Sequence, residues 1–231
     1  MLPRKSFWFG ILNCMIEAVI FDMDGLLIDS EPLWKEGEIL EFNKVGVPLT
    51  LEMTPQTTGL RTDEVVEYWY KRHPWSSPSQ EEVARKIDST VIELIRTKGK
   101  AKEGVNEVIA LCKEAGLPIA IASSSSKVLI RAVLERIGIA DKIDIIHSAH
   151  DEEYGKPHPA VYISTAKELG IHANHCLAFE DSANGILAAK AAKMKCIAIP
   201  EPIERNDKRF GIADIILHSL HDFTPEMLKD W

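Results

Sequence analysis

Apolar and polar positions follow one pattern in most of this chain and another between about residues 34 and 100. From about residue 100 onward, short apolar runs alternate with segments whose apolar residues recur at helical spacing. This alternation predicts an α/β fold, a Rossmann-like parallel sheet in three layers with helices on both faces. The expected strands are 18–21, 117–122, 143–147, 176–179, 196–200 and 214–217, and the expected helices are 127–137, 160–169 and 185–193.

Between about residues 34 and 100 the pattern predicts helices alone. Segments 34–45, 63–72 and 79–96 have helical spacing, and Ser79 with Glu82 forms a plausible capping box. The simplest interpretation is a small helical cap inserted after the first strand. We therefore expect a core domain made of residues 15–32 and 101–231, with a cap domain at residues 33–100. A chain of 231 residues is long enough for one core and one smaller unit.

The first residues have a separate character. Arg4 and Lys5 precede the short apolar stretch 7–12, which resembles the opening of a signal peptide. The stretch is too short to cross a bilayer, and no small-residue cleavage site follows it. We interpret residues 1–14 as an N-terminal extension, with Met15 as an alternative natural start.

Charge and cysteine content narrow the class of partner. The net charge of −8 argues against nucleic acid and anionic membranes as partners, and it requires a local positive site for any anionic substrate. Cys14, Cys112, Cys176 and Cys196 are far apart and form no CxxC pair, so buried free thiols are expected. These features favour a cytoplasmic protein, a monomer or weak dimer, whose partner is a small molecule.

Two acids follow the first apolar run. Residues 18–21 lead directly into Asp22, and Asp24 and Gly25 come next. Successive side chains of a strand point to opposite faces, so the two carboxylates converge only where the strand ends and the chain turns, which Gly25 permits. Two acids at the end of a buried strand are costly without a cation or a shared proton. The run therefore predicts an acidic catalytic site that holds a metal ion.

Three further polar sets lie at or near predicted strand ends, where parallel sheets bind ligands. They are the serines 123–126, Lys156, and the pair Glu180-Asp181. Each alone is explained equally well as a loop, a solvated charge or a helix start, but their occurrence together favours one site. A carboxylate can attack phosphorus, a second can move protons, and serine and lysine can hold the anion. Carboxylates at two strand ends favour Mg²⁺.

With these motifs in order, the sequence resembles the haloacid dehalogenase-like hydrolase superfamily. Residues 21–32 look like its first motif, Ser123 ends its second, Lys156 looks like its third, and residues 179–182 look like its fourth. The match spans about residues 16–217. The resemblance is strongest with the sugar-phosphatase and β-phosphoglucomutase branch. Within that branch it is strongest with the hexitol and 2-deoxyglucose-6-phosphate phosphatases, whose long first motif after the two aspartates is also present here.

The resemblance implies a role for each matching residue. Asp22 is the expected nucleophile and Asp24 the general acid/base. Magnesium is expected on the Asp22 side chain, the Asp24 carbonyl and Asp181, with Glu180 reaching it directly or through water. The phosphate is expected on Ser123, the Ser124 amide and Lys156. These roles describe a magnesium-dependent phosphatase of small phosphorylated sugars or sugar alcohols that works through an aspartyl phosphate.

Several alternatives remain at this point. By the same resemblance, an acid at Asp24 is typical of phosphatases and phosphomutases. The mutases of this branch carry a cap histidine at the position that Trp34 occupies here. This difference favours hydrolysis over β-phosphoglucomutase activity. Arg61 either grips an anion or hydroxyl of the substrate, or it is a solvated arginine of the cap or part of a structural ion pair. Two non-enzymatic hypotheses are a phospho-receiver module and a sugar-phosphate-binding protein without catalytic activity. A measurement of phosphate release from sugar phosphates in the presence of magnesium would distinguish an enzyme from both.

Overall fold

A central parallel sheet organises the chain in this computed structural model, which describes residues 16–228 and 231. Within those residues the sheet has six strands in the order β3-β2-β1-β4-β5-β6. Their bounds are β1 (Ala18–Phe21), β2 (Ile119–Ser123), β3 (Ile145–Ser148), β4 (Cys176–Glu180), β5 (Lys195–Ala198) and β6 (Ile215–Ile216). The first strand pairs with both β2 and β4, so the chain reverses its direction of travel across the sheet beside β1. Sheets of this order bind ligands at that position, beyond the carboxyl ends of the strands.

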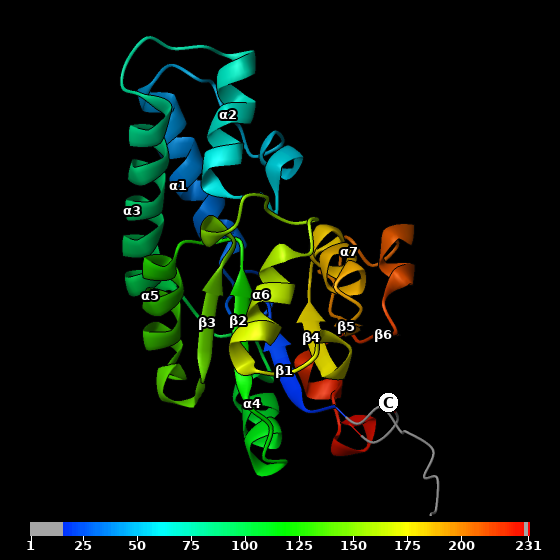
Figure 1. The fold of residues 1–231 in the computed structure, drawn as a ribbon. Coiled ribbons are helices and arrows are strands. Elements are labelled where there is room, and N and C mark those ends of the chain that lie inside the picture. The colour runs from blue at the N-terminus through cyan, green and yellow to red at the C-terminus, as the bar shows by residue number, and fades with distance from the viewer. Residues whose placement is uncertain (1–15, 229–230) are drawn as a thin grey trace, which may run out of the picture.

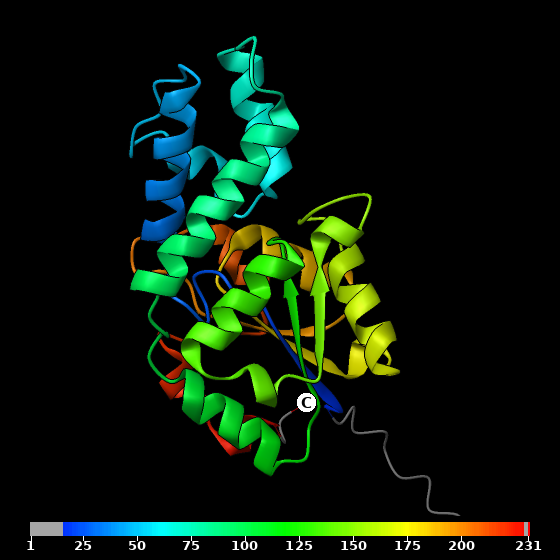
Figure 2. The same cartoon turned by 90° about the vertical axis from the view of Figure 1, so that its left-hand side faces the viewer.

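Helices cover both faces of the sheet, as the sequence predicts. They are α4 (Val105–Glu114), α5 (Lys127–Ile137), α6 (Ala160–Leu169) and α7 (Ala183–Ala191). On one face the larger strand residues, Phe21 and Ile121 among them, pack in one core with α4 and α5. On the other face mostly small residues, such as Ala120 and Ala178, pack with α6 and α7. Figure 2 shows these three layers with the sheet between the two sets of helices.

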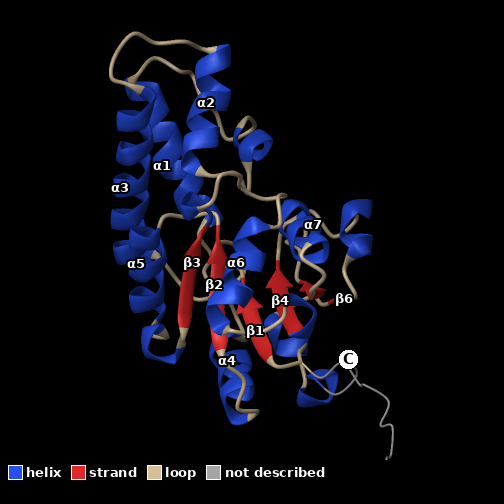
Figure 3. Ribbon diagram, in the orientation of Figure 1, coloured by secondary structure: helices blue, strands red, loops and turns tan. Residues whose placement is uncertain are grey.

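The segment between β1 and α4 is helical. It contains α1 (Glu31–Lys44), α2 (Thr62–Arg72) and α3 (Gln80–Lys98). The third of these packs against the other two and also against α5 of the core. Phe42, Trp69 and Ile87 are among its buried residues, which are continuous with the core on the α4 and α5 face. Figures 1 and 3 show the three helices standing beyond the carboxyl ends of the strands.

Some element bounds differ from the sequence-based expectation. Helix α1 begins at Glu31, three residues before the predicted start, because Pro32 is tolerated in a first helical turn. Helix α7 begins at Ala183, since the Ser182 hydroxyl accepts a hydrogen bond from the Gly185 amide. Helix α4 was absent from the prediction, although its buried residues Val105, Val108, Ile109 and Cys112 recur at helical spacing.

The predicted extension, residues 1–14, lies outside the described residues, and so does Cys14. Cys112, Cys176 and Cys196 are buried free thiols, as expected. Among the residues that the structure describes, none of the helices combines the length and the apolar character needed to cross a membrane.

Candidate active site

The polar ends of three adjacent strands meet at one edge of the sheet. Asp22 directly follows β1, Ser123 is the last residue of β2, and Glu180 is the last residue of β4. Since β2 and β4 both pair with β1, the three side chains lie close together, as the sequence predicts. A cavity of about 810 Å³, which includes solvent at its mouth, opens here toward α1 and α2. Its lining includes Asp22, Asp24, Ser123, Ser124, Lys156 and Asp181 from the predicted site.

The turn after β1 requires glycine. Gly25 has a φ of +75°, which residues with a Cβ rarely adopt. A Cβ at this position would also lie 2.0 Å from an oxygen of Asp181. The turn that directs Asp22 and Asp24 into the cavity is therefore possible only because glycine follows them.

Lys156 connects two of the strand ends. Its Nζ donates to Asp22 Oδ1 at 2.6 Å, to Glu180 Oε1 at 2.6 Å and to the Ala122 carbonyl at 3.1 Å. The lysine is 4% exposed and Glu180 is fully buried, so the ion pairs are shielded from water. This arrangement places one cation between two carboxylates from neighbouring strands.

Glu180 is held more firmly than the sequence indicated. Besides Lys156, it accepts hydrogen bonds from the Tyr162 hydroxyl at 2.7 Å and from the main-chain amides of Asp181 and Ser182. A Cβ at Gly185 would lie 1.7 Å from Glu180 Oε1, so this glycine leaves room for the carboxylate. Tyr162 carries no motif and was not expected near the site; only the fold brings it there.

The charges at this edge perturb one another. Burial raises the pKa of Asp22, and the negative charge of Glu180 adds to that rise while Lys156 opposes it. Burial together with Asp22 and Glu180 also raises the pKa of Asp181 well above its usual range. Burial alone would lower the pKa of Lys156, but Asp22 and Glu180 raise it, so this side chain stays an ammonium. A further positive charge at this edge would therefore stabilise the ionised forms of the buried carboxyl groups.

Three of the carboxylates fit a metal ion. One oxygen from each of Asp22, Glu180 and Asp181 lies within 4.8 Å of the other two. Carboxylate oxygens are the ligands that Mg²⁺ prefers. A cation among them would stabilise the charged forms of Asp22 and Asp181, whose pKa values are raised first by burial and then by their acidic neighbours. The donor set at this edge therefore suits the magnesium ion that the sequence predicts.

Asp24 is fixed by three donors. Its Oδ1 accepts from the Ser30 hydroxyl at 2.7 Å and from the Trp34 indole N–H at 2.9 Å, and its Oδ2 accepts from the Ser125 hydroxyl at 2.7 Å. Ser125 belongs to the serine set expected at this edge but carries no role in the prediction, and Ser30 is not among the predicted site residues although it lies in the first motif. The contact from Trp34 joins the helical segment to the second acid of the first motif.

The two predicted phosphate-binding serines also lie in the cavity. The Ser123 oxygen accepts from the Ser125 amide at 3.0 Å, which leaves the Ser123 hydroxyl proton available to another acceptor. The Ser124 hydroxyl donates to the Gly59 carbonyl of the helical segment at 3.2 Å. Both serines are thus at the boundary between the sheet edge and the helices above it.

Arg61 takes a different position from the rest of the predicted site. It is not among the residues that line the cavity. Its guanidinium donates to the main-chain carbonyls of Ala149 and Glu152 in the core and pairs with Asp63. In this structure Arg61 therefore joins α2 to the loop after β3, which matches the structural alternative considered for it.

Replacing Lys156 with methionine should destabilise the fold by about 3–5 kcal/mol, because Asp22 and Glu180 would stay buried without their shared cation. Urea unfolding measures the change. The matched control is Lys127→Met, which removes an exposed pair with Asp151 and should cost less than about 1 kcal/mol. A Lys156→Met variant as stable as the wild type would show that the ion pairs of Lys156 with Asp22 and Glu180 do not stabilise the fold.

The fold and these acids define a class: an α/β protein with a cluster of carboxylates at the carboxyl edge of the sheet, beneath a helical insertion. A family model for haloacid dehalogenase-like hydrolases matches residues 16–193. The chain belongs to this hydrolase family, which confirms the resemblance found in the sequence.

Individual proteins within and near this family are similar to the chain over most of its length. Hexitol phosphatase B of Escherichia coli K12 is 44% identical over 214 residues, which cover 92% of this chain and 96% of that protein. The crystal structure of β-phosphoglucomutase from Clostridium difficile superposes with a TM-score of 0.81 at 25% identity, covering 94% of this chain and 96% of the mutase. CbbY from Rhodobacter sphaeroides, solved with phosphate, has a TM-score of 0.80 at 27% identity, covering 89% of this chain and 95% of CbbY. The 44% identity to hexitol phosphatase B, together with membership of the hydrolase family, supports a phosphatase.

Proposed function

We propose that this chain is a magnesium-dependent phosphatase that releases phosphate from phosphorylated hexitols or related sugars through an aspartyl phosphate. The observation that carries the proposal is the convergence of Asp22, Asp24 and Lys156 in one cavity. The likeness to hexitol phosphatase B supports the choice of substrate class.

Asp22 is the nucleophile in this proposal. One of its carboxylate oxygens attacks phosphorus, a bond forms between that oxygen and the phosphoryl group, and the bond to the sugar oxygen breaks. Lys156 supports this step because its ammonium, 2.6 Å from Asp22 Oδ1, favours the ionised carboxylate. The same charge would attract the phosphate anion in a protein whose overall charge is −8.

Asp24 moves the protons. It gives a proton to the departing sugar oxygen and then takes one from the water that attacks the aspartyl phosphate. Both tasks need a carboxyl group in a fixed position, and the donors from Ser30, Trp34 and Ser125 hold it there. The hydroxyl of Ser123, the main-chain amide of Ser124 and Lys156 hold the phosphoryl oxygens.

Magnesium would be held by the carboxylates of Asp22 and Asp181 and the main-chain carbonyl of Asp24, with Glu180 beside them. When bound, it neutralises the phosphate and the acids around it. Glu180 has a second task in this proposal, since it fixes Lys156 against Asp22.

The helices α1 to α3 form the cap. They stand over the sheet edge and supply Trp34 and residues 54–60 to the cavity wall, so their closure would exclude water and select substrates. Phosphatase activity is favoured over β-phosphoglucomutase activity because Trp34, and not a histidine, donates to Asp24 from the cap.

Phosphate release from a panel of phosphorylated hexitols, hexoses, pentoses and nucleotides tests the function. We expect release from hexitol or sugar phosphates with Mg²⁺, and we expect a chelator to reduce it to background until Mg²⁺ is restored. Isomerisation of β-glucose 1-phosphate is run in parallel. Isomerisation without phosphate release would make the protein a mutase, and activity that survives removal of all metal would refute the proposed role of Asp181.

A further inference from the structure

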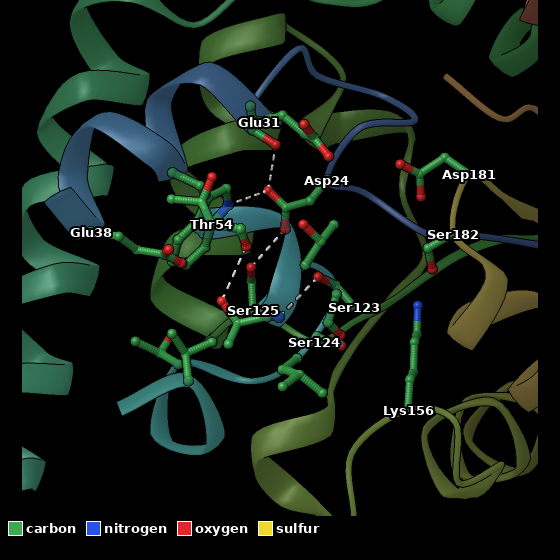
Figure 4. A pocket seen from close by; sticks show the side chains of 18 of the residues that line it. Asp24, Glu31, Glu38, Thr54, Ser123, Ser124, Ser125, Lys156, Asp181 and Ser182 are labelled. Carbon is green, nitrogen blue, oxygen red and sulfur yellow. Dashed lines mark hydrogen bonds between the residues drawn. The ribbon is translucent and has the colours of Figure 1, made fainter. Parts of the chain in front are cut away.

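A buried acid lies on the cap side of the cavity, away from the proposed phosphate site. Glu38 is on α1, lines the cavity and is 9% exposed. Figure 4 shows it on one side of the cavity with Thr54, while Lys156 and Asp181 lie on the other side and Asp24 lies between them. Trp34, which reaches Asp24, is one helical turn earlier, so Glu38 is about 6 Å further along α1. A substrate whose phosphate lay beside Lys156 would therefore extend its leaving group toward this side of the cavity.

The Glu38 carboxyl group has no hydrogen bond or ion pair with any described residue, although it is buried. The charged groups that act on it are Lys35 and Glu31, which pair with each other at 2.5 Å. Burial raises the pKa of Glu38 to about 8, with Lys35 opposing the rise and Glu31 adding to it. A neutral carboxyl group both donates and accepts hydrogen bonds. Buried polar groups are costly when they stay unpaired, so this one is suited to a ligand.

The wall around Glu38 presents acceptors and no free cation. The hydroxyls of Thr54 and Thr57 donate to the main-chain carbonyls of Leu51 and Thr54, and Thr62 donates to Asp88. Because each hydroxyl proton is already used, each of these threonine oxygens can still accept a hydrogen bond from a ligand. Of the basic residues that line the described cavity, Lys156 lies at the proposed phosphate site and Lys35 is paired with Glu31. Such a wall can accept hydrogen bonds from the hydroxyl groups of a substrate. Its described residues offer no unpaired cation to a second phosphate, which would therefore be disfavoured.

We propose that Glu38 is a specificity-determining residue that hydrogen-bonds a hydroxyl of the leaving group and selects monophosphates of neutral polyols over bisphosphates. This inference rests on the proposed phosphatase function. It adds the part of the substrate that is recognised and the residue that recognises it.

The test compares Glu38→Leu and Glu38→Met with the wild type on a hexitol phosphate and on p-nitrophenyl phosphate, whose leaving group has no hydroxyl for Glu38 to bind. We expect kcat/KM for the hexitol phosphate to fall at least about tenfold, while the value for p-nitrophenyl phosphate stays within about threefold. Glu38→Gln, which keeps a donor and an acceptor, should recover most of the loss. The matched control is Glu36→Met, on the same helix, where an exposed glutamate pairs with Lys98.

A hexose bisphosphate and the corresponding monophosphate complete the test with wild-type protein, and we expect the monophosphate to be preferred at least about tenfold. Equal losses on both test substrates, no loss in either apolar variant, or a wild-type preference for the bisphosphate would overturn the role of Glu38. Wild-type protein that releases phosphate from no substrate would instead refute the proposed function. Glu38→Gln keeps the shape of the side chain, so its selectivity tests the proposal even if the apolar variants fail to fold.

Discussion

Asp22→Asn should reduce kcat by at least about 10³-fold, because an amide oxygen cannot serve as the nucleophile that accepts the phosphoryl group. The substitution keeps the shape of the side chain and an oxygen that can face Lys156. Substrate binding is therefore expected to persist while turnover is lost. Phosphate release under saturating substrate, together with binding of inorganic phosphate to the variant, separates the two effects.

Asp29→Asn is the matched control for that substitution. Asp29 is in the same chain segment but is exposed and does not line the cavity, so its variant should keep wild-type activity. An Asp22→Asn protein that folds normally and keeps more than a few per cent of wild-type turnover would contradict the role assigned to Asp22.

Asp24→Asn should have the second-largest effect, a fall in kcat of roughly 10²–10⁴-fold. The amide cannot give a proton to the leaving oxygen or take one from water, so the aspartyl phosphate should form slowly and break down more slowly still. Quenched samples analysed by intact mass spectrometry would detect the accumulated phosphoryl group. Rapid and complete turnover in this variant would exclude Asp24 as the acid/base.

The Asp24→Asn substitution also tests the contacts that fix this side chain. The new amide would keep one oxygen for Ser30 and Trp34, while its NH₂ group would face the Ser125 hydroxyl, which can rotate to accept. The fold should therefore tolerate the change. A thermal midpoint close to that of the wild type would assign the loss of turnover to the missing proton transfer.

Local sequence patterns predicted the strand ends and hence the core of the site. Apolar runs end at Phe21 and Ala122, and because parallel strands end at one edge, Asp22 and Ser123 were expected at the same edge. The strand order, which the local patterns do not give, makes them neighbours there. The helix 160–169 was predicted with its observed bounds, since Pro159 precedes it and Gly170, with a φ of +73°, ends it. Such signals act over a few residues and are visible without a structure.

The supporting contacts depend on tertiary packing and could not be predicted. Tyr162 reaches Glu180 from α6, which packs against β1, β2 and β3, and no local pattern encodes that packing. Glu38 looks like an ordinary helix-surface acid in the sequence, and only the placement of α1 over the strands buries it. The family resemblance singles out Arg61, but nothing in the sequence predicts that its guanidinium donates to main-chain carbonyls of the core.

The most direct test of the proposed mechanism is to locate the phosphoryl group on the chain. The Asp24→Asn protein is mixed with a hexitol phosphate and Mg²⁺, quenched in acid, digested and analysed by mass spectrometry. The mechanism predicts one phosphoryl group on the carboxylate of Asp22. A phosphoryl group on another residue, or none in a variant that still releases phosphate, would contradict it.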